Sequence, residues 1–343
     1  MTIGTGLSRR HLLRAASALA ITPALAQARV CVAPPDAGRV TKAVNDAHAR
    51  FAGLTEGKNA DYIPYLAGVP SALFGVAASE PDGAVAEAGD VGYALAIESI
   101  AKVFTLALVL RESGPEAVQQ KLGTNATGLP FNSVMGVELN HGKPISPLVN
   151  AGAMATVSLV QAASPEERWN KIIGNMSRFA GRTLTVNEEV YKSEADTNEH
   201  NRGIAMLLKS YGFMYTDPME ACDIYTRECS IAVTTHDLAV MAGTLANGGI
   251  NPVTKEAVID PALVPPVLSQ MAIEGLYENT GDWMFTVGLP AKSGVGGGLI
   301  AVAPGVLGLA AFSPPLDAAG NSVRAQKAVQ SVVQALGLNI YAG

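Results

Sequence analysis

The sequence predicts an α/β protein of the α+β type: one antiparallel sheet from the N- and C-terminal segments, flanked by helices, with an inserted all-helical domain. Two observations predict this class. Short apolar runs separated by turn signals, which are typical of strands, occur before residue 98 and again after residue 282. Between these groups, apolar residues recur mainly at helical spacing. Pairing the two groups in one sheet is the simplest arrangement.

The first 28 residues are predicted to be a twin-arginine-type export signal and not part of the fold. Arg9 and Arg10 precede a short apolar stretch of small residues, which ends in Ala26-Gln27-Ala28. A basic region, an apolar region and a small-x-small motif are typical of cleaved signals. We therefore expect cleavage after Ala28 and a periplasmic or secreted protein. The alternative is an ordinary amphipathic N-terminal helix.

The sheet domain is predicted to comprise 38–105 and 283–343, after a linker at 29–37. Its strands are bounded by turn residues such as Pro81-Asp82-Gly83, and its helices are identified by apolar periodicity. Strands are expected at 73–78, 85–88, 93–97, 284–287, 298–302 and 308–312, and helices at 40–51 and 322–336.

The helical domain is predicted to span 106–282. Apolar residues recur there at helical spacing, and Asn247-Gly248-Gly249 is a typical helix C-terminal signal. From the end of the sheet segment onward, helices are expected near 99–112, 115–122, 148–162, 165–181, 200–211, 217–227, 235–247 and 261–274.

Composition narrows the classes of function. The 343 residues carry a formal charge of −6, and 48% are hydrophobic against 16% charged. This indicates a globular protein with a large core, as one large domain or two smaller ones. The acidic balance and the lack of a basic patch argue against nucleic acid as a partner. No apolar run of about 20 residues follows the first 30, so we expect no membrane span.

The cysteines and histidines predict no metal and no cofactor. Cys31, Cys222 and Cys229 lack metal-ligand spacing, and so do the five histidines. An oxidising compartment would permit a disulfide, but the odd count leaves one thiol over in a monomer. Cys222 and Cys229 would lie two turns apart if they share a helix, too far for a bridge.

A serine and a lysine one helical turn apart form the first candidate site. Ser99 lies where a strand-like run gives way to a helix-like run, and Lys102 follows three residues later. This spacing places both side chains on one helix face, and a helix N-terminus favours a developing anion. Some serine acyl-transfer enzymes use such a pair in place of Ser-His. The alternative is a capping serine beside a solvated lysine.

A glycine-rich stretch, Lys292-Ser293-Gly294-Val295 with three further glycines, forms the second candidate site. It resembles the Lys-Thr-Gly strand of serine β-lactamases and penicillin-binding proteins. Small residues on a strand let a substrate approach the backbone. We expect the N–H groups of Ser99 and Val295 to form an oxyanion hole. The alternative is a glycine-rich turn between core strands.

Taken together, the ordered motifs resemble those of the serine-dependent glutaminases, over about residues 40–340. The matching segments are Asp61-Tyr62-Ile63-Pro64, Ser99-Ile100-Ala101-Lys102, Gly128-Leu129-Pro130-Phe131-Asn132, Val149-Asn150-Ala151-Gly152-Ala153, Ser193-Glu194 with Asn201, Tyr225 before Cys229-Ser230-Ile231, 241–249 and 288–295. The resemblance implies a β-lactamase/transpeptidase-like fold and hydrolysis of L-glutamine to L-glutamate and ammonia. It also implies a homodimer or homotetramer.

The resemblance also implies a role for each matching residue. Ser99 would be the nucleophile, Lys102 would take its proton, and Val295 would donate its N–H to the amide oxygen. The remaining side chains would line the reaction centre as proton relays and substrate contacts (Tyr225 and Tyr277) or hold the amino-acid end of glutamine (Tyr62, Asn150, Glu194 and Asn201). A carboxylate suits the substrate's ammonium, and amide and hydroxyl donors suit its carboxylate.

The sequence departs from the family pattern at two places. Glu98 precedes the serine where the family usually has glutamine, and 195–200 differs from the usual arginine-containing version. If Glu98 points into the cleft, its charge favours the protonated form of Lys102. A lysine that acts as base near neutral pH needs its pKa lowered by roughly three units, about 4 kcal/mol of differential solvation.

Two other functions fit parts of the pattern. A periplasmic penicillin-recognising hydrolase of the β-lactamase type also uses Ser-x-x-Lys, and Tyr277-Glu278-Asn279 formally fits its Tyr-x-Asn tripeptide, although it lies late in the chain. A catalytically silent glutamine-binding protein would keep the pocket while Glu98 suppresses turnover. Hydrolysis of glutamine, compared with hydrolysis of a β-lactam, separates these functions.

Overall fold

A computed structural model describes residue 1 and residues 35–342, and the described residues from 35 onward belong to one compact unit. Apart from Met1, the predicted export signal lies outside the described residues, and so do Cys31 and residues 29–34 of the predicted linker. Within the described part of the chain, no helix has both the length and the apolar character needed to cross a membrane.

A five-stranded antiparallel sheet joins the two ends of the chain, as the sequence predicts. Its strand order is β2-β1-β8-β7-β6. The register pairs Gly75 of β1 with Phe312 of β8. The strands are β1 (Gly75–Ser79), β2 (Val85–Gly89), β6 (Ala291–Ser293), β7 (Gly298–Ala303) and β8 (Leu307–Phe312).

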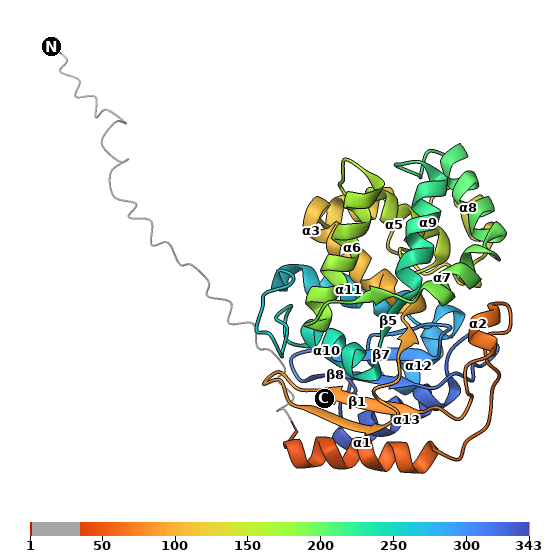
Figure 1. The fold of residues 1–343 in the computed structure, drawn as a ribbon. Helices are drawn as coiled ribbons and strands as arrows, with labels where there is room; N and C mark the ends of the chain where they lie inside the picture. The colour runs from red at the N-terminus through yellow and green to blue at the C-terminus, as the bar shows by residue number, and fades with distance from the viewer. Residues whose placement is uncertain (2–34, 343) are drawn as a thin grey trace. The chain divides into compact units, whose positions relative to one another are not determined.

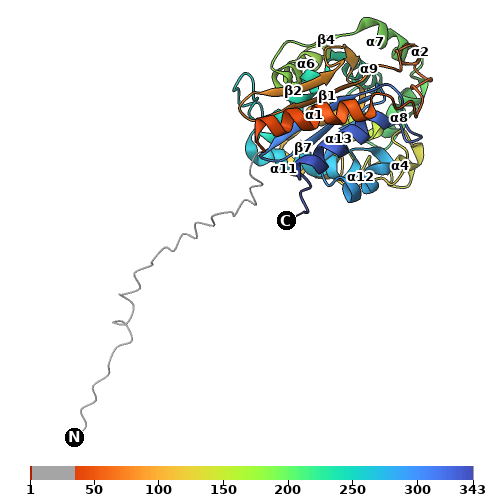
Figure 2. The ribbon, with the colours of Figure 1, turned by 90° about the horizontal axis from the view of Figure 1, so that it is seen from below.

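Helices cover both faces of this sheet. The terminal helices α1 (Ala37–Phe51) and α13 (Val323–Leu336) lie side by side on one face (Figure 2), and α10 (Thr235–Ala246) packs on the other. The strands alternate accordingly, because Leu309 joins the core under α1 and α13 while Ala310 joins the core of the helical side. Residues two positions apart on β8 therefore pack into the same core.

A second, three-stranded sheet connects the main sheet to the helices. It has the order β3 (Leu95–Ala96), β5 (Ile231–Val233) and β4 (Thr185–Val186). The sequence pattern predicts a longer strand at 93–97 and neither of the other two. β3 is short because the chain turns into a 3-10 helix directly after Ile97, whose N–H bonds Ile231.

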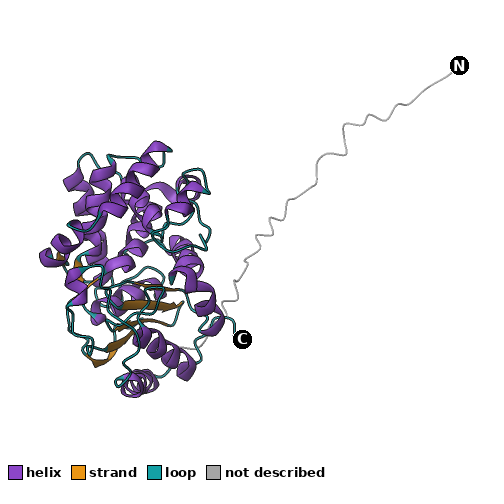
Figure 3. Ribbon diagram, turned by 90° about the vertical axis from the view of Figure 1, so that its right-hand side faces the viewer, coloured by secondary structure: helices purple, strands orange, loops and turns teal. Residues whose placement is uncertain are grey.

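The helical layer lies on the side of the sheet opposite α1 and α13, and most helices gather at that end of the molecule (Figures 1 and 3). The predicted helices at 99–112 and 115–122 form one element with a kink at Gly114, just before Pro115. The remaining helices are α2 (Pro64–Ala67), α3 (Ala101–Lys121), α4 (Val134–Glu138), α5 (Asn150–Leu159), α6 (Pro165–Ala180), α7 (Glu188–Ala195), α8 (Glu199–Ser210), α9 (Pro218–Cys229), α11 (Val264–Glu274) and α12 (Thr280–Thr286).

The predicted strand at 284–287 is wrong, because these residues form the end of α12 and its C-cap. The buried residues nearby are Trp283 and Val287, four positions apart, which is the spacing of one helix face. Phe285, between them, is 90% exposed. This short, mostly apolar run therefore resembles a strand without having the burial pattern of one.

The predicted helical-domain limits, 106–282, stay a prediction. α10 belongs to that interval, yet it packs directly against β8, β1 and β7 of the main sheet. Residues that the sequence assigns to the inserted domain therefore also cover one face of the main sheet.

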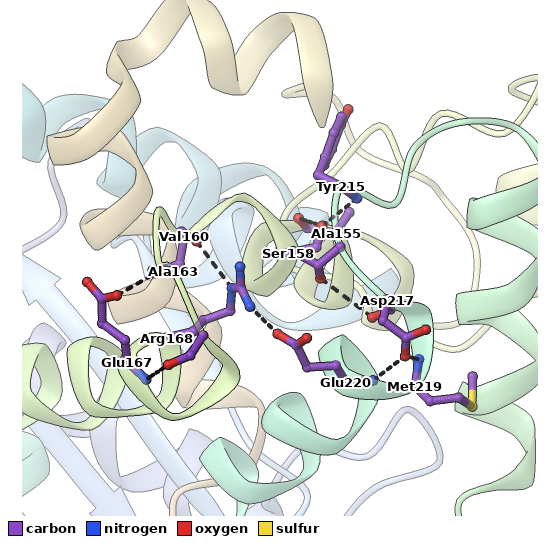
Figure 4. Close-up of polar contacts among 12 residues, drawn as sticks. Ala155, Ser158, Val160, Ala163, Glu167, Arg168, Tyr215, Asp217, Met219 and Glu220 are labelled. Carbon is purple, nitrogen blue, oxygen red and sulfur yellow. Dashed lines mark hydrogen bonds and ion pairs between the residues drawn. The ribbon is translucent and has the colours of Figure 1, made fainter.

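A polar network that is buried at Arg168 and exposed at Asp217 ties α6 to the start of α9 (Figure 4). Arg168 donates to the carbonyl oxygen of Val160 (3.2 Å) and forms an ion pair with Glu220. Asp217 caps α9 by accepting bonds from the N–H groups of Met219 (2.9 Å) and Glu220 (3.0 Å). These contacts fix the helix whose opposite end carries Tyr225, Thr226, Glu228 and Cys229.

Candidate active site

Ser99 and Lys102 meet at the junction of the sheet and the helical layer. Ser99 lies in a 3-10 turn, Glu98–Ile100, that runs directly into α3, and Lys102 is the second residue of that helix. Both are almost fully buried, and Lys102 Nζ lies 2.6 Å from Ser99 Oγ. The three-residue spacing therefore yields the contact that the sequence predicts.

The surroundings of Lys102 favour its neutral form more than water does. Nζ also donates to Asn150 Oδ1 (2.8 Å), and it lies 5.4 Å from the centre of the Tyr225 ring. Burial lowers the pKa of Lys102 to about 8, although Cys229 and the carboxyls of Glu228 and Glu98 act in the opposite direction. The lysine is thus partly unprotonated near neutral pH.

A chain of amides from α5 and α8, joined by hydroxyl groups of α9, leads away from the lysine. Asn150 Oδ1 also accepts from the Tyr225 hydroxyl (3.0 Å), and its Nδ2 donates to Asn201 Oδ1 (3.0 Å). Asn201 in turn donates to Asn198 (2.7 Å), which donates to Thr226 (2.6 Å). The structure thus joins three predicted site residues and adds two that the sequence pattern does not identify, because their contact depends on how α8 packs on α9.

The glycine-rich segment after β6 lies against the backbone that carries Ser99. A Cβ on Gly294 would lie 2.9 Å from the carbonyl oxygen of Ile97 and 3.4 Å from the nitrogen of Ser99. Among the described residues, the N–H groups of Ser99 and Val295 have no hydrogen-bond acceptor. Two free donors on adjoining segments are therefore available for the oxyanion hole that the sequence predicts.

Tyr277 lies beside this segment. It is buried, has a positive φ of 55°, and its hydroxyl donates to the carbonyl oxygen of Ser293 (3.4 Å) while also lying near Ser99. The ammonium of Lys292, fully buried, lies 4.2 Å from the centre of the Tyr277 ring. Burial lowers the pKa of Lys292 well below its usual value. The site thus contains a second buried lysine, which the Lys-Ser-Gly motif marks.

Two carboxyl groups lie beside the serine and lysine. Glu98 is 3% exposed, and one ligand atom each of Glu98, Glu194 and Cys229 lies within 4.8 Å of the other two. Burial raises the pKa of Glu98 to about 7, although Glu194 and Lys102 counteract it. Burial and the neighbouring Glu98 raise the pKa of Glu194 well above its usual value. Glu98 therefore points inward, but as one of a pair that retains protons near neutral pH.

This cluster bears on the prediction of no metal. In the described part of the chain, one group of potential ligands lies close enough together to hold a metal ion. It consists of Glu98, Glu194 and Cys229. The predicted absence of a metal stays a prediction. Cys222 and Cys229 are both buried on α9 and form no disulfide among the described residues, as their spacing on one helix predicts.

Tyr62 occupies the surface side of the site. The residue is 55% exposed and lines a cavity of about 480 Å³ with Phe131 and Gly320. Burial raises the pKa of the Tyr62 hydroxyl, with a further contribution from Tyr277 and Glu98. A Cβ on Gly320 would lie 3.4 Å from Val295 and 3.7 Å from Tyr277, so this cavity adjoins the reaction centre.

Glu228 is a buried carboxyl behind Lys102 that the sequence pattern does not identify. It accepts from the Thr105 hydroxyl (2.6 Å), while its Oε1 has no partner among the described residues. Burial raises its pKa to about 8. The unfolded chain releases this proton near pH 4.5 and the folded chain only near 8, so stability falls as pH rises between these values.

Glu228→Gln is therefore expected to stabilise the protein increasingly from pH 4.5 to about 8, with no further change above that. The stability difference between the variant and the wild type should grow by on the order of 5 kcal/mol between pH 4.5 and 8, because the two pKa values lie about 3.5 units apart and each unit corresponds to about 1.4 kcal/mol. Thermal unfolding of both proteins across this pH range measures it. A stability difference that does not change with pH would contradict the assignment.

A family model described as Glutaminase matches residues 57–341. A glutaminase of Mycobacterium ulcerans (strain Agy99) is 59% identical over 303 residues, which is 88% of this chain and 95% of the relative. Glutaminase 1 of Escherichia coli O157:H7 is 54% identical over 308 residues, 90% of this chain and 99% of the relative.

Solved structures show the same similarity. A probable glutaminase named ybaS is superimposable with a TM-score of 0.89 at 54% identity, covering 90% of this chain and all of that chain. A probable glutaminase from Bacillus subtilis, complexed with 6-diazo-5-oxo-L-norleucine, has a TM-score of 0.79 at 28% identity. The latter match covers 88% of this chain and 96% of that chain.

Proposed function

The chain belongs to the glutaminase family, with its β-lactamase-like fold, and hydrolyses L-glutamine to L-glutamate and ammonia; we propose that it does so through a γ-glutamyl ester on Ser99. The observation that supports this mechanism best is the buried contact of 2.6 Å between Lys102 Nζ and Ser99 Oγ. A serine is a weak nucleophile until an adjacent base accepts its proton.

In the first step, Lys102 takes the Ser99 proton as Oγ attacks the amide carbon of glutamine. The N–H groups of Ser99 and Val295 stabilise the negative charge that develops on the amide oxygen. The C–N bond breaks, and the nitrogen leaves as ammonia with the proton held by Lys102. Water then attacks the ester, Lys102 receives its proton and returns it to Ser99, and glutamate is released.

The other site residues bind and align the substrate in this proposal. Glu194 holds the α-ammonium, and the amides of Asn150 and Asn201 hold the carboxylate together with the Tyr225 hydroxyl. The hydrogen-bonded chain through Asn150 supports this role, because it orients these amides before substrate arrives. Tyr277 lines the reaction centre, where it and Tyr225 relay protons, and Tyr62 closes the surface side.

Purified residues 29–343 are expected to release ammonia from L-glutamine and to leave a chromogenic cephalosporin intact. The physical reason is that Glu194, Asn150 and Asn201 match an amino-acid head group and not a bicyclic amide. A coupled ammonia assay and absorbance at the cephalosporin's product wavelength measure the two activities. Cephalosporin turnover with silent glutamine would favour the penicillin-recognising function. Glutamine binding without turnover would favour the silent binding protein.

We also propose that the protein is exported and forms a homodimer or homotetramer. The paired Arg9 and Arg10 and the small-residue motif ending at Ala28 support export. Sequencing the N-terminus of the protein recovered from the periplasm or medium tests it, with Arg29 expected as the first residue. Light scattering of the same material measures the oligomeric state.

A further inference from the structure

The direction of the Glu98 side chain is set by its own backbone conformation and by two glycines that it packs against. Its backbone has a positive φ of 51°, which an L-residue adopts only when its surroundings require it. A Cβ added to Gly294 or Gly296 would lie 3.1 Å from Glu98 Cβ or Cγ, respectively. The two glycines thus leave the space that the Glu98 side chain fills on its way into the site.

The carboxyl group of Glu98 lies in the site. One of its two oxygens has no hydrogen-bond partner among the described residues. Glu98 Oε1 and Glu194 Oε1 are both shut off from solvent, and neither has a hydrogen-bond partner among the described residues. An unpaired buried carboxyl oxygen is costly, so such a pair requires either protons or a cation between its members. A cationic ligand between the two carboxyl groups would give both unpaired oxygens a partner.

Lys102 does not occupy this position, because its ammonium is bonded to Ser99 and Asn150. The substrate of the established reaction carries one cationic group, an α-ammonium with three N–H donors. We propose that Glu98 is a second carboxylate of the ammonium subsite, and that it and Glu194 bind the substrate's α-ammonium together. This inference rests on the proposed placement of glutamine at Ser99 and extends it by one residue.

Proton release accompanies binding in this arrangement. The groups that face Glu98 are Glu194 from α7, Lys102 from α3, Cys229 from α9, and the tyrosines Tyr62 and Tyr277. The empty pair retains protons near neutral pH because burial raises the pKa of both carboxyls. An incoming ammonium favours their ionised forms, so protons leave to solvent and binding tightens as pH rises.

Glu98→Gln tests the assignment through substrate discrimination. Glutaramate, which is glutamine without its α-amino group, cannot use the ammonium subsite. We expect kcat/KM for L-glutamine to fall about 10- to 100-fold in the variant, mainly through KM, the range for a lost hydrogen bond to a charged group. The value for glutaramate should change less than about threefold. Glu228→Gln, an equally buried replacement outside the cluster, should leave the ratio of the two substrates unchanged.

A binding measurement without turnover completes the test. Calorimetry of Ser99→Ala with L-glutamine, in two buffers of different ionisation enthalpy, gives the protons released near pH 7. We expect fewer from Ser99→Ala/Glu98→Gln, and none from either protein with glutaramate. Equal losses for both substrates, or unchanged proton release, would overturn the role of Glu98. So would loss of wild-type activity in a chelator with recovery on adding a divalent metal.

The two proposals fail in different ways. If Ser99 is not the nucleophile, Ser99→Ala continues to release ammonia from both substrates, whatever Glu98 does. If only the assignment of Glu98 fails, Ser99→Ala is inactive while Glu98→Gln discriminates between the substrates as the wild type does.

Discussion

Ser99→Ala is expected to lower kcat for ammonia release from L-glutamine by at least about 10⁴-fold, since removing the nucleophile of a covalent mechanism leaves only binding and oxyanion stabilisation. The side chain is small and almost fully buried, with one hydrogen bond to Lys102. Its removal should therefore leave glutamine binding within about threefold of wild type. A coupled ammonia assay and calorimetry measure the two effects.

Ser79→Ala provides the matched control. Ser79 is a fully buried serine at the end of β1, against α10, and its hydroxyl has no partner among the described residues. The variant removes the same atom from an equally enclosed place outside the site, so it should keep wild-type activity. Comparable activity losses in the two variants would mean that packing, and not nucleophilic attack, explains the effect at Ser99.

Lys102→Met and Lys102→Arg are both expected to lower kcat by at least about 10³-fold, within the range for loss of a general base. Methionine fills a similar volume without a proton acceptor. Arginine retains a positive charge but cannot lose a proton in a protein. Equal inactivity of the two variants would assign Lys102 the role of a base. Substantial activity of the arginine variant would instead indicate that a cation suffices.

The pH dependence of the wild type follows from the same residue. Lys102 must be neutral to accept the Ser99 proton, and its pKa is lowered to about 8 by burial. Activity, measured as kcat at saturating glutamine, should thus rise with pH and level off above about 8. Neither Lys102 variant should show this rise. Thermal unfolding should show that both Lys102 variants remain folded, because removing Lys102 leaves Asn150 Oδ1 with one donor fewer.

The sequence predicts the parts of the structure that depend on local spacing. The strands at both ends, most helices and the contact between Ser99 and Lys102 follow from periodicity and from the three-residue separation. Asn150 and Asn201 lie on different helices, 51 residues apart, so only the family resemblance places them together. Spacing along the chain holds no information on that contact.

The errors and omissions have a common physical cause, which is that burial is decided by tertiary packing. The segment 284–287 is a short, mostly apolar run like a strand, but Trp283 and Val287 anchor it as a helix. Glu228 looks like an ordinary charged residue of an amphipathic helix until α3 and α5 cover it. The inward direction of Glu98 depends on a positive φ and on the room left by Gly294 and Gly296, none of which the sequence pattern reveals.

The register that joins β1 to β8 also has a consequence for biosynthesis. Residues 75–79 pair with residues 308–312, so the central strands of the sheet meet only when almost the whole polypeptide has left the ribosome. Until then the early hairpin of β1 and β2 exposes an unsatisfied edge, which is a template for association with other chains. Nascent molecules should therefore depend on chaperones up to the last few dozen codons.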